Sequence, residues 1–174
     1  MRRLGRLDEA VEASRKALTL KPDYADAHYN MGIALKEQGK LDDAIASFSK
    51  ALKLKPDYAE AHNNLGIVLQ EQGKLVDAIG SYSKALSVKP DYAEAYNNTG
   101  VALQAHGKPD EAIASYRKAL ALKSDYAEAH NNLHALLLDP MGNGARTVAH
   151  GSSAARLAPL EYAELYRPGM GTEN

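Results

Sequence analysis

The chain has 174 residues with 21 basic and 22 acidic side chains, a formal charge of −1 and no cysteine. The absence of cysteine excludes disulfides, thiol redox centres and cysteine-bound zinc, and the near-zero charge offers no general attraction for nucleic acid or anionic lipid. The sequence also lacks a signal peptide and the run of about 20 apolar residues that spans a membrane, so we expect a soluble, cytoplasmic protein.

A period of 34 residues organises most of the chain. The string Asp-Tyr-Ala begins at Asp23, Asp57, Asp91 and Asp125, and the intervals between these positions are all 34 residues. Such a period is the signature of stacked structural repeats. We therefore divide the chain into a partial unit, three complete units, the restart of a further unit and a tail outside the pattern. Their ranges are 1–24, 25–58, 59–92, 93–126, 127–138 and 139–174.

The first predicted element is a helix over about 7–20, which has the pattern of the second helix of a unit. The first helix that would cover its apolar stripe is missing, so side chains such as Val11 and Leu18 would be exposed. An apolar patch of this kind marks an interface. We expect it to pair with a second molecule, giving a homo-oligomer through the array ends, or with the C-terminal tail. A chain that is a fragment of a longer protein explains the pattern equally well.

Each complete unit is predicted to form two antiparallel helices. In the unit 59–92 the first helix covers about 59–72, and Gly73 ends it because glycine tolerates the left-handed conformation of a tight turn. The second helix covers about 76–88, and Pro90 prevents its continuation. Apolar residues face each other at helical spacing along the two helices. Such a hairpin cannot bury its apolar face alone and must stack on its neighbours.

The 34-residue unit resembles the tetratricopeptide repeat. The small residue at the eighth position of that repeat occurs as Gly32, Gly66 and Gly100, and its aromatic residue in the second helix occurs as Phe48, Tyr82 and Tyr116. Its alanines and proline are present as well: Ala10, Ala44, Ala78, Ala112, Ala51, Ala85, Ala119, Pro22, Pro56 and Pro90. The resemblance implies an all-α protein, a right-handed α-solenoid of antiparallel helix-turn-helix repeats whose first helices line a concave groove for peptides or partner helices.

This sequence departs from the family pattern at several positions. The fourth position, usually tryptophan, is His28, His62, Tyr96 or His130. Three further departures are found at the ends of the array: Ser14 replaces the aromatic residue, Ser124 replaces the last proline and His134 replaces the small residue. Packing demands relax at the ends of such arrays, where capping begins.

Asparagines repeat once or twice per unit on the first helices. The sites are Asn30, Asn64, Asn98 and Asn132, with Asn63, Asn97 and Asn131 beside three of them. An amide carries both a donor and an acceptor, so a row of amides can pair with the backbone of an extended peptide. The alternative is that these side chains only satisfy neighbouring helix ends, or that they are regular because the repeats arose by duplication.

The second position of each first helix is acidic, at Asp26, Glu60, Glu94 and Glu128. Some domains of this family bind a terminal carboxylate, and negative side chains in the groove would repel such a ligand. The acids therefore favour a neutral or basic peptide. Their alternative role is to interact with the positive end of the helix dipole.

The strings AEAHNNLG, QEQGKL, ALALKSDYAEAH and LLLDP resemble the array that precedes the catalytic region of protein O-linked N-acetylglucosamine transferases. The residues after Pro140 are too few for a glycosyltransferase domain. If this resemblance reflects kinship, the chain is a substrate-recruiting arm without its enzyme.

A search for catalytic and metal-binding patterns yields no set. His130 and His134 have the spacing of two metal ligands, but no neighbouring glutamate or third ligand accompanies them. We therefore expect a non-enzymatic protein-interaction scaffold without metal or cofactor, whose partner is a protein or peptide and neither nucleic acid nor a membrane. In the irregular tail, a short capping helix near 159–167 is an alternative to a disordered segment.

Overall fold

The computed structural model describes residues 2–139, and every regular element in this part of the chain is an α-helix. Residue 1 and residues 140–174, which include the predicted capping helix near 159–167, lie outside the described residues. The elements are α1 (Arg2–Leu20), α2 (Ala25–Glu37), α3 (Leu41–Leu54), α4 (Ala59–Glu71), α5 (Leu75–Val88), α6 (Ala93–Ala105), α7 (Pro109–Leu122) and α8 (Ala127–Leu138).

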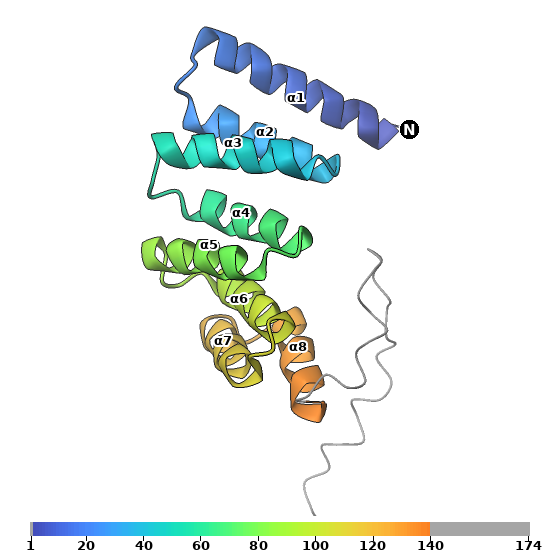
Figure 1. Ribbon diagram of the computed structural model, residues 1–174, viewed down its shortest axis with the longest axis vertical. Helices are drawn as coiled ribbons and strands as arrows, with labels where there is room; N and C mark the ends of the chain where they lie inside the picture. Colours follow the sequence, from blue (N-terminus) through green and yellow to red (C-terminus); the bar gives the residue numbers. More distant parts are fainter. Residues whose placement is uncertain (1, 140–174) are drawn as a thin grey trace, which may run out of the picture. The chain divides into compact units, whose positions relative to one another are not determined.

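The helices follow one another in chain order along a stack, with α1 at one end and α7 and α8 at the other (Figure 1). Three antiparallel hairpins, α2 with α3, α4 with α5 and α6 with α7, make the most extensive contacts. We call α2, α4, α6 and α8 the first helices, and α1, α3, α5 and α7 the second helices. The stack is the predicted right-handed α-solenoid of helix-turn-helix repeats. Within the described residues, no helix is both long and apolar enough to cross a bilayer.

The predicted helix ends in the unit 59–92 agree with the structure to within one residue, because the turn signals are strong. Gly73 lies between α4 and α5 with φ of 75°, a left-handed conformation that a residue with a Cβ adopts only with strain. The backbone nitrogen of Lys74 then donates to the carbonyl of Leu69 at 2.9 Å, which satisfies a free carbonyl at the helix end.

Within each hairpin an aromatic side chain of the second helix lies against a glycine of the first. A Cβ added to Gly66 would lie 2.5 Å from Tyr82, and one added to Gly100 would lie 2.5 Å from Tyr116. Both rings are almost completely buried. The glycine at the eighth position is therefore required by the close approach of the ring.

The first helix of the chain differs from the prediction in one respect. α1 begins at Arg2 instead of at about residue 7, and Val11 is only 8% exposed, in an apolar cluster with Leu35 and Phe48. The expectation that Val11 would be exposed is wrong, because a second helix also packs against the first helix of the next unit, here α2. Leu18 is half-buried and lines a furrow between α1 and α3.

The first helices form the inner side of the curved stack. Successive first helices approach one another directly, from α2 to α4, α4 to α6 and α6 to α8. Successive second helices make no such contact, and furrows separate α1 from α3 and α3 from α5. Layers that are close on one side and open on the other curve toward the close side, which defines the inner surface as that of the first helices.

Candidate functional site

The predicted asparagines lie on the first helices, where they link successive repeats. Asn98 donates from Nδ2 to Oδ1 of Asn63 at 3.1 Å, and Asn132 donates to Oδ1 of Asn97 at 3.0 Å. In the first complete unit Tyr29 occupies the position of Asn63, and its hydroxyl accepts from Asn64 at 3.2 Å. We call these three pairs the amide ladder.

The buried members of the ladder are fully used within the protein. Asn63 and Asn97 have no exposed surface. Their Nδ2 atoms donate to the carboxylates of Glu94, at 3.1 Å, and Glu128, at 3.0 Å, in the following unit. The interpretation of Asn63 and Asn97 as peptide-binding groups is therefore wrong for this structure. Each amide is enclosed between two repeats, which a count of positions along the sequence cannot reveal.

The remaining asparagines differ in what they offer to a ligand. Asn30 and Asn131 are exposed, whereas Asn64, Asn98 and Asn132 are half-buried. Asn64 makes further bonds, donating to the carbonyl of Glu60 at 3.0 Å and accepting from Lys36 at 3.2 Å. Within the described part of the chain, Oδ1 of Asn98 and of Asn132 has no hydrogen-bond partner. These two oxygens can accept from the backbone of a ligand.

Carboxylates follow the same surface, one in the first turn of each first helix, as predicted: Asp26, Glu60, Glu94 and Glu128. All are exposed except Glu60, which is half-buried and forms an ion pair of 3.5 Å with Lys89. Burial raises the pKa of Tyr29, and the negative charges of Glu60 and Glu94 raise it further. The pKa of Tyr126 is raised by burial, then by Glu128 and Glu94. The inner surface therefore carries a negative potential.

The structure also contains a recurring pair that the sequence analysis missed. The ammonium group of Lys55 lies 4.4 Å from the ring centroid of Tyr58, and Lys89 lies 4.7 Å from that of Tyr92. The same stacking recurs for Lys21 with Tyr24 and for Lys123 with Tyr126. These cation–π contacts fix the turn between repeats. The spacing of lysine three residues before each tyrosine was a signal that could have found them.

Comparison with known families agrees with this architecture. The family model described as "TPR repeat" matches residues 2–39 and 34–73, and the one described as "Tetratricopeptide repeat" matches residues 57–125. Together the matches cover most of the described chain. The chain belongs to the tetratricopeptide repeat family.

Solved tetratricopeptide structures resemble the chain over most of its length. The crystal structure of MamA is 27% identical, with a TM-score of 0.73, and the alignment covers 80% of this chain and 82% of that one. PilF of Pseudomonas aeruginosa is 25% identical, with a TM-score of 0.73 and coverage of 78% and 62%. The first tetratricopeptide domain of Spaghetti (RPAP3), bound to the HSP90 peptide SRMEEVD, is 26% identical, with a TM-score of 0.64 and coverage of 66% and 90%. None of the curated protein sequences matched the chain.

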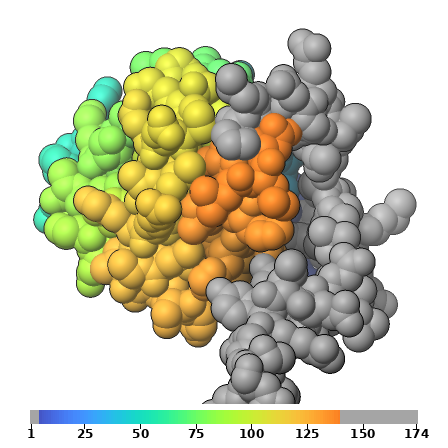
Figure 2. Space-filling model, turned by 90° about the horizontal axis from the view of Figure 1, so that it is seen from below, coloured from blue at the N-terminus to red at the C-terminus, as the bar shows by residue number. Residues whose placement is uncertain are grey.

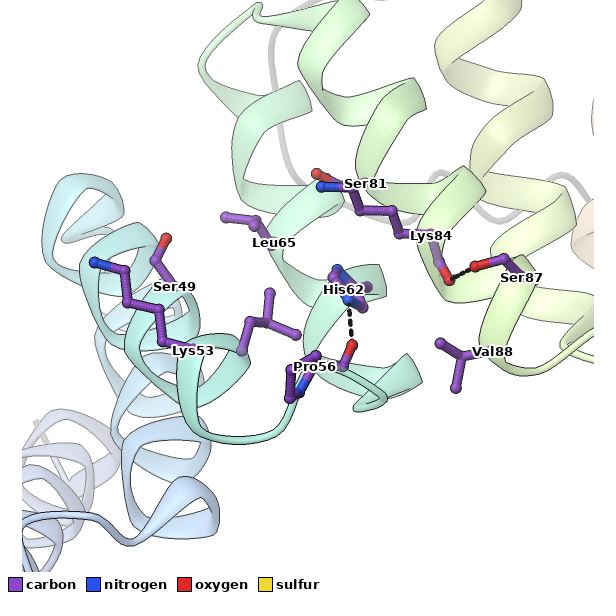
Figure 3. Close-up of a pocket in the computed structure, with 10 residues that line it drawn as sticks. Ser49, Lys53, Pro56, His62, Leu65, Ser81, Lys84, Ser87 and Val88 are labelled. Atoms are coloured by element: carbon purple, nitrogen blue, oxygen red, sulfur yellow. Dashed lines mark hydrogen bonds between the residues drawn. The ribbon is translucent and has the colours of Figure 1, made fainter.

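Histidine has a structural role at the fourth position of the tetratricopeptide unit. The Nε2 atom of His62 lies 2.9 Å from the carbonyl oxygen of Pro56 (Figure 3). Because a carbonyl only accepts, Nε2 carries the proton and donates it. The same bond joins His28 to Pro22, at 3.1 Å, and His130 to Ser124, at 2.9 Å. These histidines satisfy the last carbonyls before each turn.

The bond of His130 leaves little reason to assign it as a metal ligand with His134. Among the described residues no group of three or more His, Asp or Glu side chains is arranged to hold a metal ion. The chemistry that the tetratricopeptide surface offers is therefore recognition by hydrogen bonds and charge.

Proposed function

We propose that this chain is a non-enzymatic scaffold that binds an extended peptide or a partner helix on the inner surface of its tetratricopeptide array. The fold supports this proposal, because one of the similar solved domains is bound to a peptide of HSP90. Proteins of this architecture present a continuous surface built from equivalent side chains of successive repeats.

The row of carboxylates on the inner surface is the observation that selects the kind of peptide. Asp26, Glu94 and Glu128 are exposed there, and the raised pKa of Tyr29 reports the negative charge around it. Such a surface attracts a neutral or basic peptide and repels an acidic one. The peptide SRMEEVD of the similar domain has more acidic than basic residues, so we infer a different ligand class for this chain.

The half-buried asparagines supply hydrogen bonds in this proposal. Asn98 and Asn132 each keep an acceptor oxygen toward the inner surface, one repeat apart. Their donor groups are engaged by Asn63 and Asn97, which hold each amide in one orientation. Orientation before binding reduces the entropy lost when the ligand is ordered. A peptide backbone is read at these two positions with little regard to its side chains.

A peptide array with graded net charge tests the proposal. We expect the double variant Glu60→Gln with Glu94→Gln to bind basic peptides more weakly at low salt, because two carboxylates are neutralised without a change of size. The matched control is Asp110→Asn with Glu111→Gln, which removes two exposed charges from the second helix α7. Equal losses in both variants would show that net charge alone governs binding, and would reject the inner surface.

A second array screen compares wild type with the double variant Asn64→Ala and Asn98→Ala. Unchanged binding of neutral peptides by a variant that retains its helical circular dichroism would defeat the amide mechanism. No comparison supports the alternative in which the array recruits substrates for a glycosyltransferase. A catalytic reading frame next to this one would be needed to reopen it.

A further inference from the structure

The two ends of the array present the two halves of one hairpin. α8 is a first helix, and within residues 2–139 no second helix folds back on it. α1 is a second helix, and no first helix precedes it in the chain. The two helices lie at opposite ends of the stack (Figure 1), and α8 reaches the surface at its end beside α7 (Figure 2).

On α8, side chains that are buried in the internal hairpins are open. Leu137 is 52% exposed, whereas Leu103, its equivalent in α6, is 6% exposed against α7. His134 is also exposed and stands at the position of Gly100. This face contains the residues that would meet a second helix of the same repeat.

On α1, the corresponding face is open as well. Ala10 is exposed, whereas its equivalents Ala44 and Ala78 have no exposed surface. Ser14 stands at the position of the aromatic rings, Phe48 and Tyr82, that pack on glycine inside the array. This face contains the residues that would meet a first helix.

We propose that α8 of one molecule receives α1 of a second molecule, so that the two helices complete a repeat between chains. The strongest reason is an exchange of sizes at one contact. Inside the array a glycine on the first helix faces a large ring on the second, as Gly100 faces Tyr116. At the ends the large side chain is on the first helix, His134, and the small one is on the second helix, Ser14. Together the two pairs fill a similar volume, and exchanges that conserve volume are the ones that a core tolerates.

The amide ladder provides an independent reason. Its rule is that the sixth residue of one first helix donates to the fifth residue of the preceding first helix, as Asn98 does to Asn63. Within the described residues the ladder ends with Asn131, a fifth residue that no amide reaches, and begins with Asn30, a sixth residue that reaches none. Both are exposed. Stacking α1 and α2 of a second molecule on α8 places Asn30 where it donates to Asn131, and the ladder continues across the junction.

The contact is heterologous, since it joins the two different ends of identical chains. A heterologous contact that does not close into a ring adds further molecules in a line. We therefore expect linear assemblies that lengthen with protein concentration and extend the inner surface. This inference is independent of the proposed peptide binding.

Blocking one end at a time tests the direction of the contact in the 174-residue chain. Ala10→Arg and Leu137→Arg each place a charge on an exposed position of one open face, so the variants should fold as wild type does. By analytical ultracentrifugation, the mass of wild type should rise with concentration, and each variant alone should remain a monomer. An equimolar mixture should give a dimer and no longer species, because each chain has one functional end. Monomeric wild type at all concentrations, or association of either variant alone, would overturn the proposal.

Exchanging the sizes tests the contact itself. Ser14→Tyr should abolish association, since the new ring meets His134 of the neighbouring molecule. Adding His134→Gly in the same chain should restore it, because the glycine–tyrosine pair of the internal repeats is then reproduced. Association of Ser14→Tyr at the level of wild type, or no recovery in the double variant, would contradict the predicted pairing.

Discussion

Asn98 donates a hydrogen bond to Asn63 at 3.1 Å, although 35 positions separate the two residues in the chain. Asn63 has no exposed surface and donates onward to Glu94 of the same helix as Asn98. A buried amide is satisfied only when both neighbours occupy the right positions, and an unsatisfied one is costly. The pair therefore fixes how α6 sits on α4, and it is a device for stacking repeats before it is a surface for binding.

Removing a buried amide should destabilise the array. In Asn97→Ala the carboxylate of Glu128 and the amide of Asn132 both lose their partner, and we expect the free energy of unfolding to fall by about 1–3 kcal/mol. Urea unfolding followed by circular dichroism, at a concentration where the chain is monomeric, measures this. The matched control is Asn131→Ala, an exposed asparagine at the same position of the next unit, which should change stability by less than about 0.5 kcal/mol. Equal losses would mean that the ladder adds nothing to stability.

Much of the fold could be predicted from the sequence because local signals repeat. Gly73 and Pro90 are each sufficient to mark an end of a helix, and the 34-residue period shows which helices pair. The partners of Asn63 could not be predicted. Every position of a duplicated unit is regular, so regularity does not distinguish a buried amide from an exposed one. The burial of Val11 was missed for a related reason, since it depends on contact with the next repeat and not on its own.

Two glycine substitutions should have effects of opposite sign. Gly66→Ala places a Cβ 2.5 Å from the ring of Tyr82, so the helices must separate, and we expect a loss of about 1–3 kcal/mol. Gly80→Ala, on the exposed side of α5, meets nothing within 4 Å and should stabilise by about 0.5–1 kcal/mol through its better helix propensity. Thermal unfolding of the two variants compares them directly. A stabilising Gly66→Ala would show that the close approach is not required.

Residues on the two helices of a hairpin should be energetically coupled through the aromatic position. Tyr82 donates from its hydroxyl to Gln70 at 3.1 Å, and Tyr116 does so to Gln104 at 3.0 Å. In the first complete unit the ring is Phe48, and Lys36, which has no acceptor, stands at the glutamine position. We expect Phe48→Tyr to destabilise by about 1–3 kcal/mol, because its buried hydroxyl lacks an acceptor.

Adding Lys36→Gln should recover part of that loss. A double-mutant cycle on the free energy of unfolding separates the coupling, which we expect to be about 1 kcal/mol and favourable, from the lost bond between Lys36 and Asn64. A coupling energy near zero would show that the hydroxyl is satisfied in another way.

Alkaline pH should destabilise the array through its tyrosines. Burial is the main cause that raises the pKa of six of them, namely Tyr29, Tyr58, Tyr82, Tyr92, Tyr116 and Tyr126. An unfolded tyrosine titrates at a pKa of about 10. Above that pH the unfolded chain releases protons that the folded chain retains, so stability is full below about pH 10 and falls as the pH rises further.

One substitution identifies the contribution of a single ring to this loss. Tyr116 has no exposed surface, and its pKa is raised by burial and by the charge of Glu128. In Tyr116→Phe the decline of the free energy of unfolding above pH 10 should be less steep, by up to about 1.4 kcal/mol per pH unit, because one retained proton is removed. Urea unfolding at several pH values between 8 and about 11 gives the slope, and tyrosinate absorbance shows when the rings ionise. An identical slope in the variant would mean that this ring ionises in the folded array as readily as in the unfolded chain.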